Sequence, residues 1–284
     1  MPDNTNEAPA TAPPITNEIR PPLLDLSLAD AELHDVAFPA LTNTLTPMVG
    51  LINHGCEGAC AALAQAMRDQ IATSGGLDGG VKQQACQMDE GEPCAAAAAE
   101  LRTCLRGVCL RALRIALKDE SLERTLAAAS LDVQGRLCLR AYPAVAPCDA
   151  GADLVRLGAH CDSTLVTLLW SDGPGLQVLD PKRAAEWEPG AVMRYGLPTM
   201  GDVDAVSELR DDQWAMVNLP WASNPLLLTL GTSWLSAELT SSSCPARSAV
   251  LHRVTMATER TRYSLPFLAD LVPAAMEVPK AGGA

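Results

Sequence analysis

Three residues of this chain have the types and spacing needed to bind a metal ion together: His160, Asp162 and, much later, His252. Two histidines and one carboxylate on one face of an octahedral metal leave three positions open, as in non-haem Fe(II) oxygenases, whereas structural zinc requires a fourth protein ligand. On a strand, alternate side chains point to the same side, so His160 and Asp162 would share a face and Cys161 would lie on the other. A His-x-Asp pair alone is weak support, because three-residue matches arise by chance. These residues are therefore a candidate iron site that needs further signals.

A second pair could bind a carboxylate. His252 lies in a β-branched run, residues 249–254, that predicts a strand, and Arg262 and Ser264 follow ten and twelve residues later. Their separation by two would place a guanidinium and a hydroxyl side by side on one face of the next strand. Arginine suits a buried carboxylate because its planar fork donates two hydrogen bonds and keeps its charge when desolvated. Arg262 and Ser264 are thus a candidate anion clamp.

With these residues, four further segments resemble Fe(II)- and 2-oxoglutarate-dependent oxygenases of the isopenicillin N synthase-like, plant-type branch. In family order they are Leu23-Leu24-Asp25-Leu26-Ser27, Leu51-Ile52-Asn53-His54-Gly55, Leu139-Arg140-Ala141-Tyr142-Pro143 and Gly175-Leu176-Gln177-Val178-Leu179. The resemblance covers residues 23–268. It implies that His160, Asp162 and His252 bind Fe(II), and that Arg262, Ser264 and Tyr142 bind 2-oxoglutarate. It also implies O2 as co-substrate, with ascorbate as a further candidate cofactor.

The chain departs from the family pattern in two places. Where the family usually has Asn-Tyr-Tyr-Pro, this chain has Arg140 and Ala141 before Tyr142, so only the second tyrosine carries over. The separation between His160 and His252 is also longer than usual, with extra sequence around residues 181–212 and 240–245. We expect a reshaped substrate pocket there, and the first of these segments could form a lid or a surface loop.

The fold predicted from these patterns is mainly β with flanking helices, around a double-stranded β-helix (jelly-roll, cupin-like) core. Residues 1–20 are rich in proline and polar residues and are expected to form a disordered tail. Residues 21–135 are expected to form a helical and mixed region that packs on the core. Residues 136–270 are expected to form the jelly-roll oxygenase core, and 271–284 a C-terminal tail.

Two helices and a series of strands are expected along the chain. Residues 57–72 predict a helix that ends before Ser74-Gly75-Gly76, and residues 95–118 predict a second. The second helix has an apolar stripe at spacings of three and four that should pack on the core: Leu101, Leu105, Val108, Ala112 and Ile115. Strands are predicted over 136–142, 153–170, 175–179, 213–219, 226–231 and 249–268.

Composition excludes several classes of partner. The net charge of −13 and pI near 4.7 would repel a nucleic-acid backbone. No run of about 18 apolar residues predicts a membrane span, and the polar N-terminus does not resemble a secretion signal, so we expect a cytoplasmic protein. In that compartment the ten cysteines are expected to be reduced thiols that pack as small hydrophobes and bind no metal.

Three functional hypotheses follow. The first is an Fe(II)- and 2-oxoglutarate-dependent dioxygenase that hydroxylates or desaturates a small molecule and releases succinate and CO2. The second is a non-haem iron oxidase of the same fold that needs no 2-oxoglutarate. The third is a non-catalytic sensor that binds iron and 2-oxoglutarate. Substrate-dependent succinate release would separate the first two hypotheses. No heptad repeat or interface segment indicates an oligomeric state.

Overall fold

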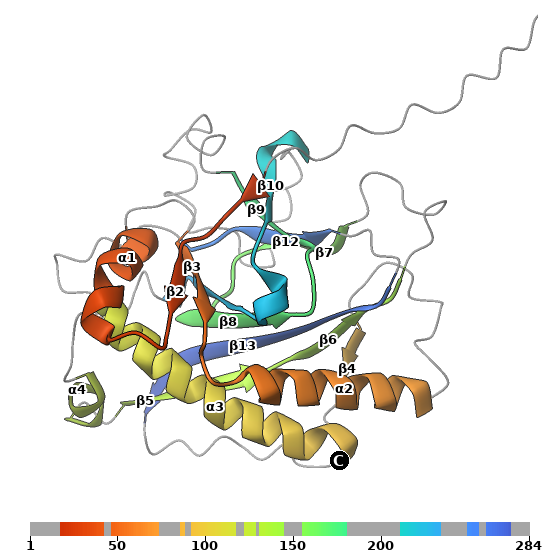
Figure 1. Ribbon diagram of the computed structural model, residues 1–284, viewed down its shortest axis with the longest axis horizontal. Helices are drawn as coiled ribbons and strands as arrows, with labels where there is room; N and C mark the ends of the chain where they lie inside the picture. Colours follow the sequence, from red (N-terminus) through yellow and green to blue (C-terminus); the bar gives the residue numbers. More distant parts are fainter. Residues whose placement is uncertain are drawn as a thin grey trace, which may run out of the picture.

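Two β-sheets face each other in the computed structural model, and the helices pack on the outer side of the larger sheet (Figure 1). The structure describes residues 18–42, 47–73, 86–88, 92–117, 122–128, 131–144, 155–180, 211–233, 249–255 and 260–273. The prediction of a mainly β protein with flanking helices is confirmed. The predicted tails and the extra segment at 181–212 lie almost wholly outside the described residues, and the segment at 240–245 lies wholly outside them. The proposed domain boundaries stay predictions.

Among the described strands, the smaller sheet has the order β1 (Glu18–Ile19), β10 (Trp214–Val217), β9 (Leu176–Leu179), β12 (His252–Thr255) and β7 (Val155–His160). The larger sheet has the order β2 (Leu23–Asp25), β3 (Met48–Ile52), β11 (Leu226–Leu230), β8 (Val166–Ser171), β13 (Arg262–Pro273), β6 (Leu139–Tyr142) and β4 (Cys86–Met88). The C-terminal half of β13 also pairs with β5 (Leu131–Leu137). The long strand β13 thus pairs with β8 along one edge and with β6 and β5 along the other.

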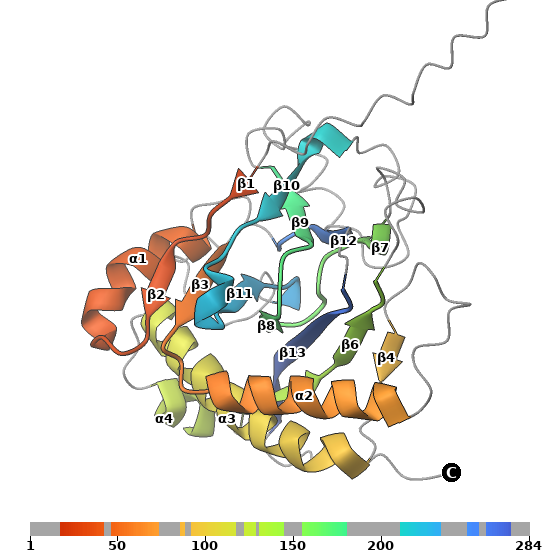
Figure 2. The same ribbon diagram turned by 45° about the vertical axis from the view of Figure 1, so that its right-hand side comes forward.

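The described part of the chain has the helices α1 (Asp30–Thr42), α2 (Glu57–Thr73), α3 (Glu92–Leu117) and α4 (Leu122–Ala128). It also has short 3-10 turns, η1 (Asp211–Gln213) and η2 (Trp221–Ser223). Figure 2 shows α2 and α3 on the side of β13 and β6 that faces away from β9, β10 and β12. The predicted stripe of α3 is buried, and Leu101 and Leu105 have no exposed surface. Burying one such leucine stabilises the fold by about 1.5–3 kcal/mol, so this stripe attaches α3 firmly to the sheet.

Alternation along the strands of the larger sheet separates two environments. On β13, Tyr263, Leu265, Phe267 and Ala269 join the core cluster that contains the helices. Their neighbours Arg262, Ser264, Pro266 and Leu268 face the smaller sheet. Because side chains alternate with a period of two, one strand therefore contributes to the main core and to the inner face at once.

A disulfide joins Cys56, just before α2, to Cys104 in α3. The prediction that the cysteines are all reduced is therefore wrong for this pair. The two Cα atoms lie 5.9 Å apart, within the range that a disulfide needs, because α2 and α3 pack side by side. Cys60 and Cys109 are buried thiols as predicted, and burial raises the pKa of each to about 12. Neither forms a thiolate at pH 7.

Reducing the Cys56–Cys104 disulfide should lower the free energy of unfolding by about 2–4 kcal/mol, because the bond closes a long loop and restricts the unfolded chain. Urea unfolding with and without a thiol reductant measures this difference. The Cys104→Ala variant is the control, and its midpoint should not depend on reductant. A wild-type midpoint that is the same in both buffers would contradict the disulfide.

No helix within the described residues is long and apolar enough to cross a membrane. The predicted strands are present with shifted ends, and three of the predicted runs are broken. The run at 136–142 falls on the end of β5 and on β6. The run predicted at 153–170 contains β7 and most of β8, and the run predicted at 249–268 contains β12 and the first part of β13. Strand β5 begins at Leu131, before the predicted start of the core at residue 136.

Candidate functional site

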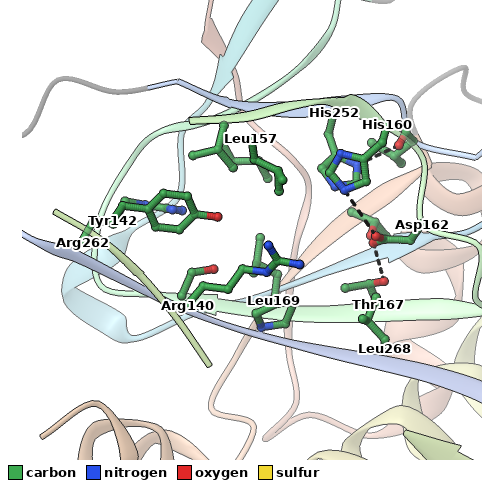
Figure 3. A pocket seen from close by; sticks show the side chains of 16 residues that line it. Arg140, Tyr142, Leu157, His160, Asp162, Thr167, Leu169, His252, Arg262 and Leu268 are labelled. Atoms are coloured by element: carbon green, nitrogen blue, oxygen red, sulfur yellow. Dashed lines mark hydrogen bonds and ion pairs between the residues drawn. The ribbon is translucent and has the colours of Figure 1, made fainter. Parts of the chain in front are cut away.

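The three candidate metal ligands meet at one end of the space between the sheets (Figure 3). His160 ends β7 and His252 begins β12, and the two are directly paired across the antiparallel ladder. One ligand atom from each of His160, Asp162 and His252 lies within 4.8 Å of the others. The imidazole centroids of the histidines are 4.3 Å apart, and Nε2 of His160 is 3.8 Å from Oδ1 of Asp162. This arrangement can hold one metal ion on one face.

Asp162 reaches this group by a different route from the one predicted. Strand β7 ends at His160, so Asp162 lies two residues beyond it, in the turn that leads to β8. Cys161 does point away from the metal ligands, into an apolar cluster with Trp214 and Leu251. The turn, and not strand alternation, therefore brings the carboxylate next to the histidine.

Hydrogen bonds fix which nitrogen of each histidine is available. Nδ1 of His160 donates to the carbonyl oxygen of Gly158 at 2.8 Å, and Nδ1 of His252 donates to that of Val250 at 2.9 Å. A carbonyl can only accept, so each Nδ1 carries the proton and each Nε2 presents a lone pair toward Asp162. Burial, followed by the charge of His252, lowers the pKa of His160 to about 4. His160 is therefore neutral at pH 7, as a metal ligand must be.

Thr167, on β8, orients the carboxylate. Its Oγ1 donates to Oδ2 of Asp162 at 2.6 Å, while Oδ1 lies on the side of His160. Sequence reasoning missed this residue. The available signal was a single hydroxyl in the apolar run Val166-Thr167-Leu168-Leu169, close after the His-x-Asp pair. A hydrogen bond of this kind holds a ligating carboxylate in one orientation and tunes it.

Replacing Thr167 with valine should weaken metal binding roughly 10- to 100-fold, because Asp162 loses the group that orients it. An anaerobic Fe(II) titration of the purified protein measures the affinity. Thr229→Val is a matched control, since Thr229 lines the same cavity from β11 and does not hydrogen-bond to Asp162. Equal affinities in the two variants would show that the hydroxyl of Thr167 does not support the carboxylate.

At the other end of the site lies a buried guanidinium. Arg262 on β13 is only 1 % exposed, and its Nε donates to the carbonyl oxygen of Gly173 at 3.1 Å. Its guanidinium carbon lies 5.2 Å from the ring centroid of Tyr142, the residue paired with it on β6. Nη1 of Arg262 has no hydrogen-bond partner among the described residues. Because buried donors are normally satisfied, this atom indicates a missing acceptor.

Ser264 is two residues from Arg262 on the same face, so the structure places guanidinium, hydroxyl and the phenol of Tyr142 around one position. Burial raises the pKa of Tyr142, which therefore keeps its proton and can donate a hydrogen bond. A carboxylate could accept from all three residues. The donor set thus fits the distal carboxylate of 2-oxoglutarate.

Both ends open into one cavity of about 590 Å³, including the space that opens to solvent. All six residues predicted from the sequence line it, namely His160, Asp162, His252, Arg262, Ser264 and Tyr142. Much of the remaining wall is apolar, with Leu157, Leu169, Leu176, Val250, Val254 and Leu268. An apolar wall with a few polar groups is typical of a site that binds an organic molecule.

No protein-family model matches the chain, and no curated protein sequence matches it. Solved structures do match. JOX2 in complex with 2OG, Fe and JA is 15% identical with a TM-score of 0.57, covering 94% of this chain and 80% of that one. The dioxygenase for auxin oxidation 1 from Arabidopsis thaliana, as its 2-oxoglutarate binary complex, is 16% identical with a TM-score of 0.54, covering 87% and 91%.

A full-length protein from Neurospora crassa, solved in complex with alpha-KG, is 16% identical with a TM-score of 0.55, covering 91% of this chain and 89% of that one. At these identities the likeness concerns the fold. The predicted jelly-roll core is confirmed, and the chain has the fold of dioxygenases that have been solved with 2-oxoglutarate and, in one case, with Fe.

Proposed function

We propose that the protein is an Fe(II)- and 2-oxoglutarate-dependent dioxygenase of the isopenicillin N synthase-like branch, which hydroxylates or desaturates a small molecule and releases succinate and CO2. One observation carries the proposal. A single cavity contains two histidines and a carboxylate at one end, and a buried arginine with an unsatisfied Nη1 at the other. The buried arginine favours the 2-oxoglutarate-dependent enzyme, because its unsatisfied Nη1 can donate to the distal carboxylate of that co-substrate.

Each residue has a defined role in this proposal. His160 and His252 would bind Fe(II) through Nε2, and Asp162 would bind it through the carboxylate that Thr167 orients. Three ligands leave three positions for the keto-acid end of 2-oxoglutarate and for O2. Arg262, Ser264 and Tyr142 would bind the distal carboxylate. When bound, the metal would supply the oxidising chemistry, and the apolar wall would keep water from it.

The test is anaerobic addition of Fe(II) and 2-oxoglutarate to the purified protein, followed by visible absorption spectroscopy. We expect the weak charge-transfer band of an iron-chelated 2-oxo acid. Iron binding without the band would favour the 2-oxoglutarate-independent oxidase, and no iron binding would contradict the proposed ligands. Slow succinate formation after O2 is admitted would then distinguish an enzyme from a non-catalytic sensor.

A further inference from the structure

A second arginine enters the same cavity. Arg140 lies on β6, two residues before Tyr142, and pairs across the ladder with Ser264. It therefore projects from the same face of the larger sheet as Tyr142, Arg262 and Ser264, and it lines the cavity. Figure 3 shows its guanidinium between Tyr142 and Asp162, on the metal side of the cavity. The resembling family usually has an asparagine at this position, so this positive charge is a feature of the present chain.

The guanidinium of Arg140 differs from those of Arg253 and Arg260 in what surrounds it. Arg253 bonds to Gln177 and Asp211, and Arg260 bonds to Asp172. For the guanidinium of Arg140, the described residues provide no hydrogen bond and no ion pair. The acidic side chain that lines the cavity is Asp162, and its carboxylate is already directed at Thr167 and the histidines. A half-buried guanidinium without an acceptor indicates that an anion binds beside it.

Charge balance identifies the source of that anion. In the proposed complex, the two positive charges of Fe(II) and the one of Arg262 balance the negative charge of Asp162 and the two of 2-oxoglutarate. The two histidines add no charge, because imidazole binds a metal ion only in its neutral form. The site is therefore already neutral without Arg140. When the co-substrate is bound, the positive charge of Arg140 is not balanced by any of these groups. A molecule with one negative charge would restore neutrality in this partly desolvated cavity.

We propose that Arg140 binds the carboxylate of the primary substrate, and that the substrate class is a monocarboxylic acid with an apolar body. The apolar body follows from the wall formed by Leu157, Leu169 and Leu268, which lies beside Arg140 and the metal ligands. This inference rests on the proposed function, because the charge balance assumes Fe(II) and 2-oxoglutarate. The arginine would hold the acid group in two hydrogen bonds and so fix which carbon lies near the metal.

The experiment uses the protein loaded anaerobically with Fe(II) and 2-oxoglutarate, in the wild type, Arg140→Gln and Arg136→Gln. Arg136 is an exposed arginine on the neighbouring strand β5, outside the cavity, and its variant controls for loss of one positive charge. Thermal melting shows that each variant is folded. Saturation-transfer NMR then measures binding of acetate and phenylacetate, each against its neutral amide, acetamide and phenylacetamide.

We expect the wild type and Arg136→Gln to bind phenylacetate roughly 10- to 100-fold more tightly than Arg140→Gln does, which is the loss expected for a charge-assisted pair. The amide should bind all three proteins with the same low affinity. Acid binding that does not depend on Arg140, or the absence of acid binding to the wild type, would overturn the inference.

A second readout separates this inference from the proposed function. The affinity for 2-oxoglutarate, measured by the visible band, should be the same in Arg140→Gln and the wild type. A large loss of 2-oxoglutarate affinity in Arg140→Gln, with unchanged acid binding, would show that Arg140 binds the co-substrate. That result would overturn the inferred class of primary substrate. If the wild type forms no band at all, the proposed function fails, whereas Arg140-dependent binding of acetate can still be measured.

Discussion

The His160→Ala variant should retain no Fe(II) under conditions in which the wild type binds it stoichiometrically. Among the described residues three protein ligands meet at this site, and removing one leaves two on an open site. We expect the affinity to fall by more than roughly 100-fold, which exceeds the cost of losing a supporting residue alone. The measurement is an anaerobic Fe(II) titration, followed by metal analysis after gel filtration.

A matched control for this variant is His34→Ala. His34 is a half-buried histidine on α1, and its Nδ1 bonds to the carbonyl oxygen of Ile115 at 2.7 Å, away from the cavity. The His34→Ala variant should bind Fe(II) as the wild type does. Both variants should melt cooperatively, since His160 is partly exposed and lies at the end of its strand. Stoichiometric binding of Fe(II) by His160→Ala would contradict the assignment of this histidine as a ligand.

The Arg262→Gln variant should bind 2-oxoglutarate roughly 10- to 100-fold more weakly, while its affinity for Fe(II) stays unchanged. The variant removes a charge-assisted hydrogen bond, worth about 1.5–3 kcal/mol, at the end of the cavity away from the metal ligands. Glutamine cannot replace the planar fork of the guanidinium. Titration of the Fe(II)-loaded protein with 2-oxoglutarate, followed by the visible band, gives the affinity.

Arg260→Gln is the control for this second prediction. Arg260 is exposed, lies two residues before Arg262 and bonds to Asp172 at 2.7 Å. The Arg260→Gln variant also loses one positive charge, close to Arg262 in the sequence but outside the cavity. Its binding of 2-oxoglutarate should therefore persist. Because Arg262 also bonds to Gly173, the melting temperature of each variant is measured first. A folded Arg262→Gln protein with wild-type affinity would refute the clamp.

Much of the candidate site could be predicted because strand periodicity determines which side chains share a face. Arg262 and Ser264, two residues apart, do lie on one face of β13, and Tyr142 is paired with Arg262 from β6. His252 is paired with His160. The shared face of Arg262 and Ser264 follows from their spacing, whereas the resemblance to the family, through the order of its motifs, brought His252 and Tyr142 into the predicted site. The metal-binding and 2-oxoglutarate-binding roles of the residues stay predictions until the variants are measured.

The features that sequence reasoning missed depend on contacts between distant segments. The Cys56–Cys104 disulfide requires α2 and α3 to lie against each other, and neither cysteine has a spacing that indicates its partner. The support of Asp162 by Thr167 depends on how the turn after β7 directs the carboxylate, which a period-two pattern does not describe. The missing partner of Arg140 could be recognised only once the surrounding side chains were placed.

The alternation along β13, β8 and β6 also has a consequence for how this protein can change. Every second position on these strands belongs to the main core, and the positions between them line the cavity. Substitutions at Leu169, Pro266 or Leu268 would alter the chamber while the helix-facing neighbours remain in place. New substrate preferences could therefore evolve, or be selected from libraries at those three positions, without a matching loss of folding stability.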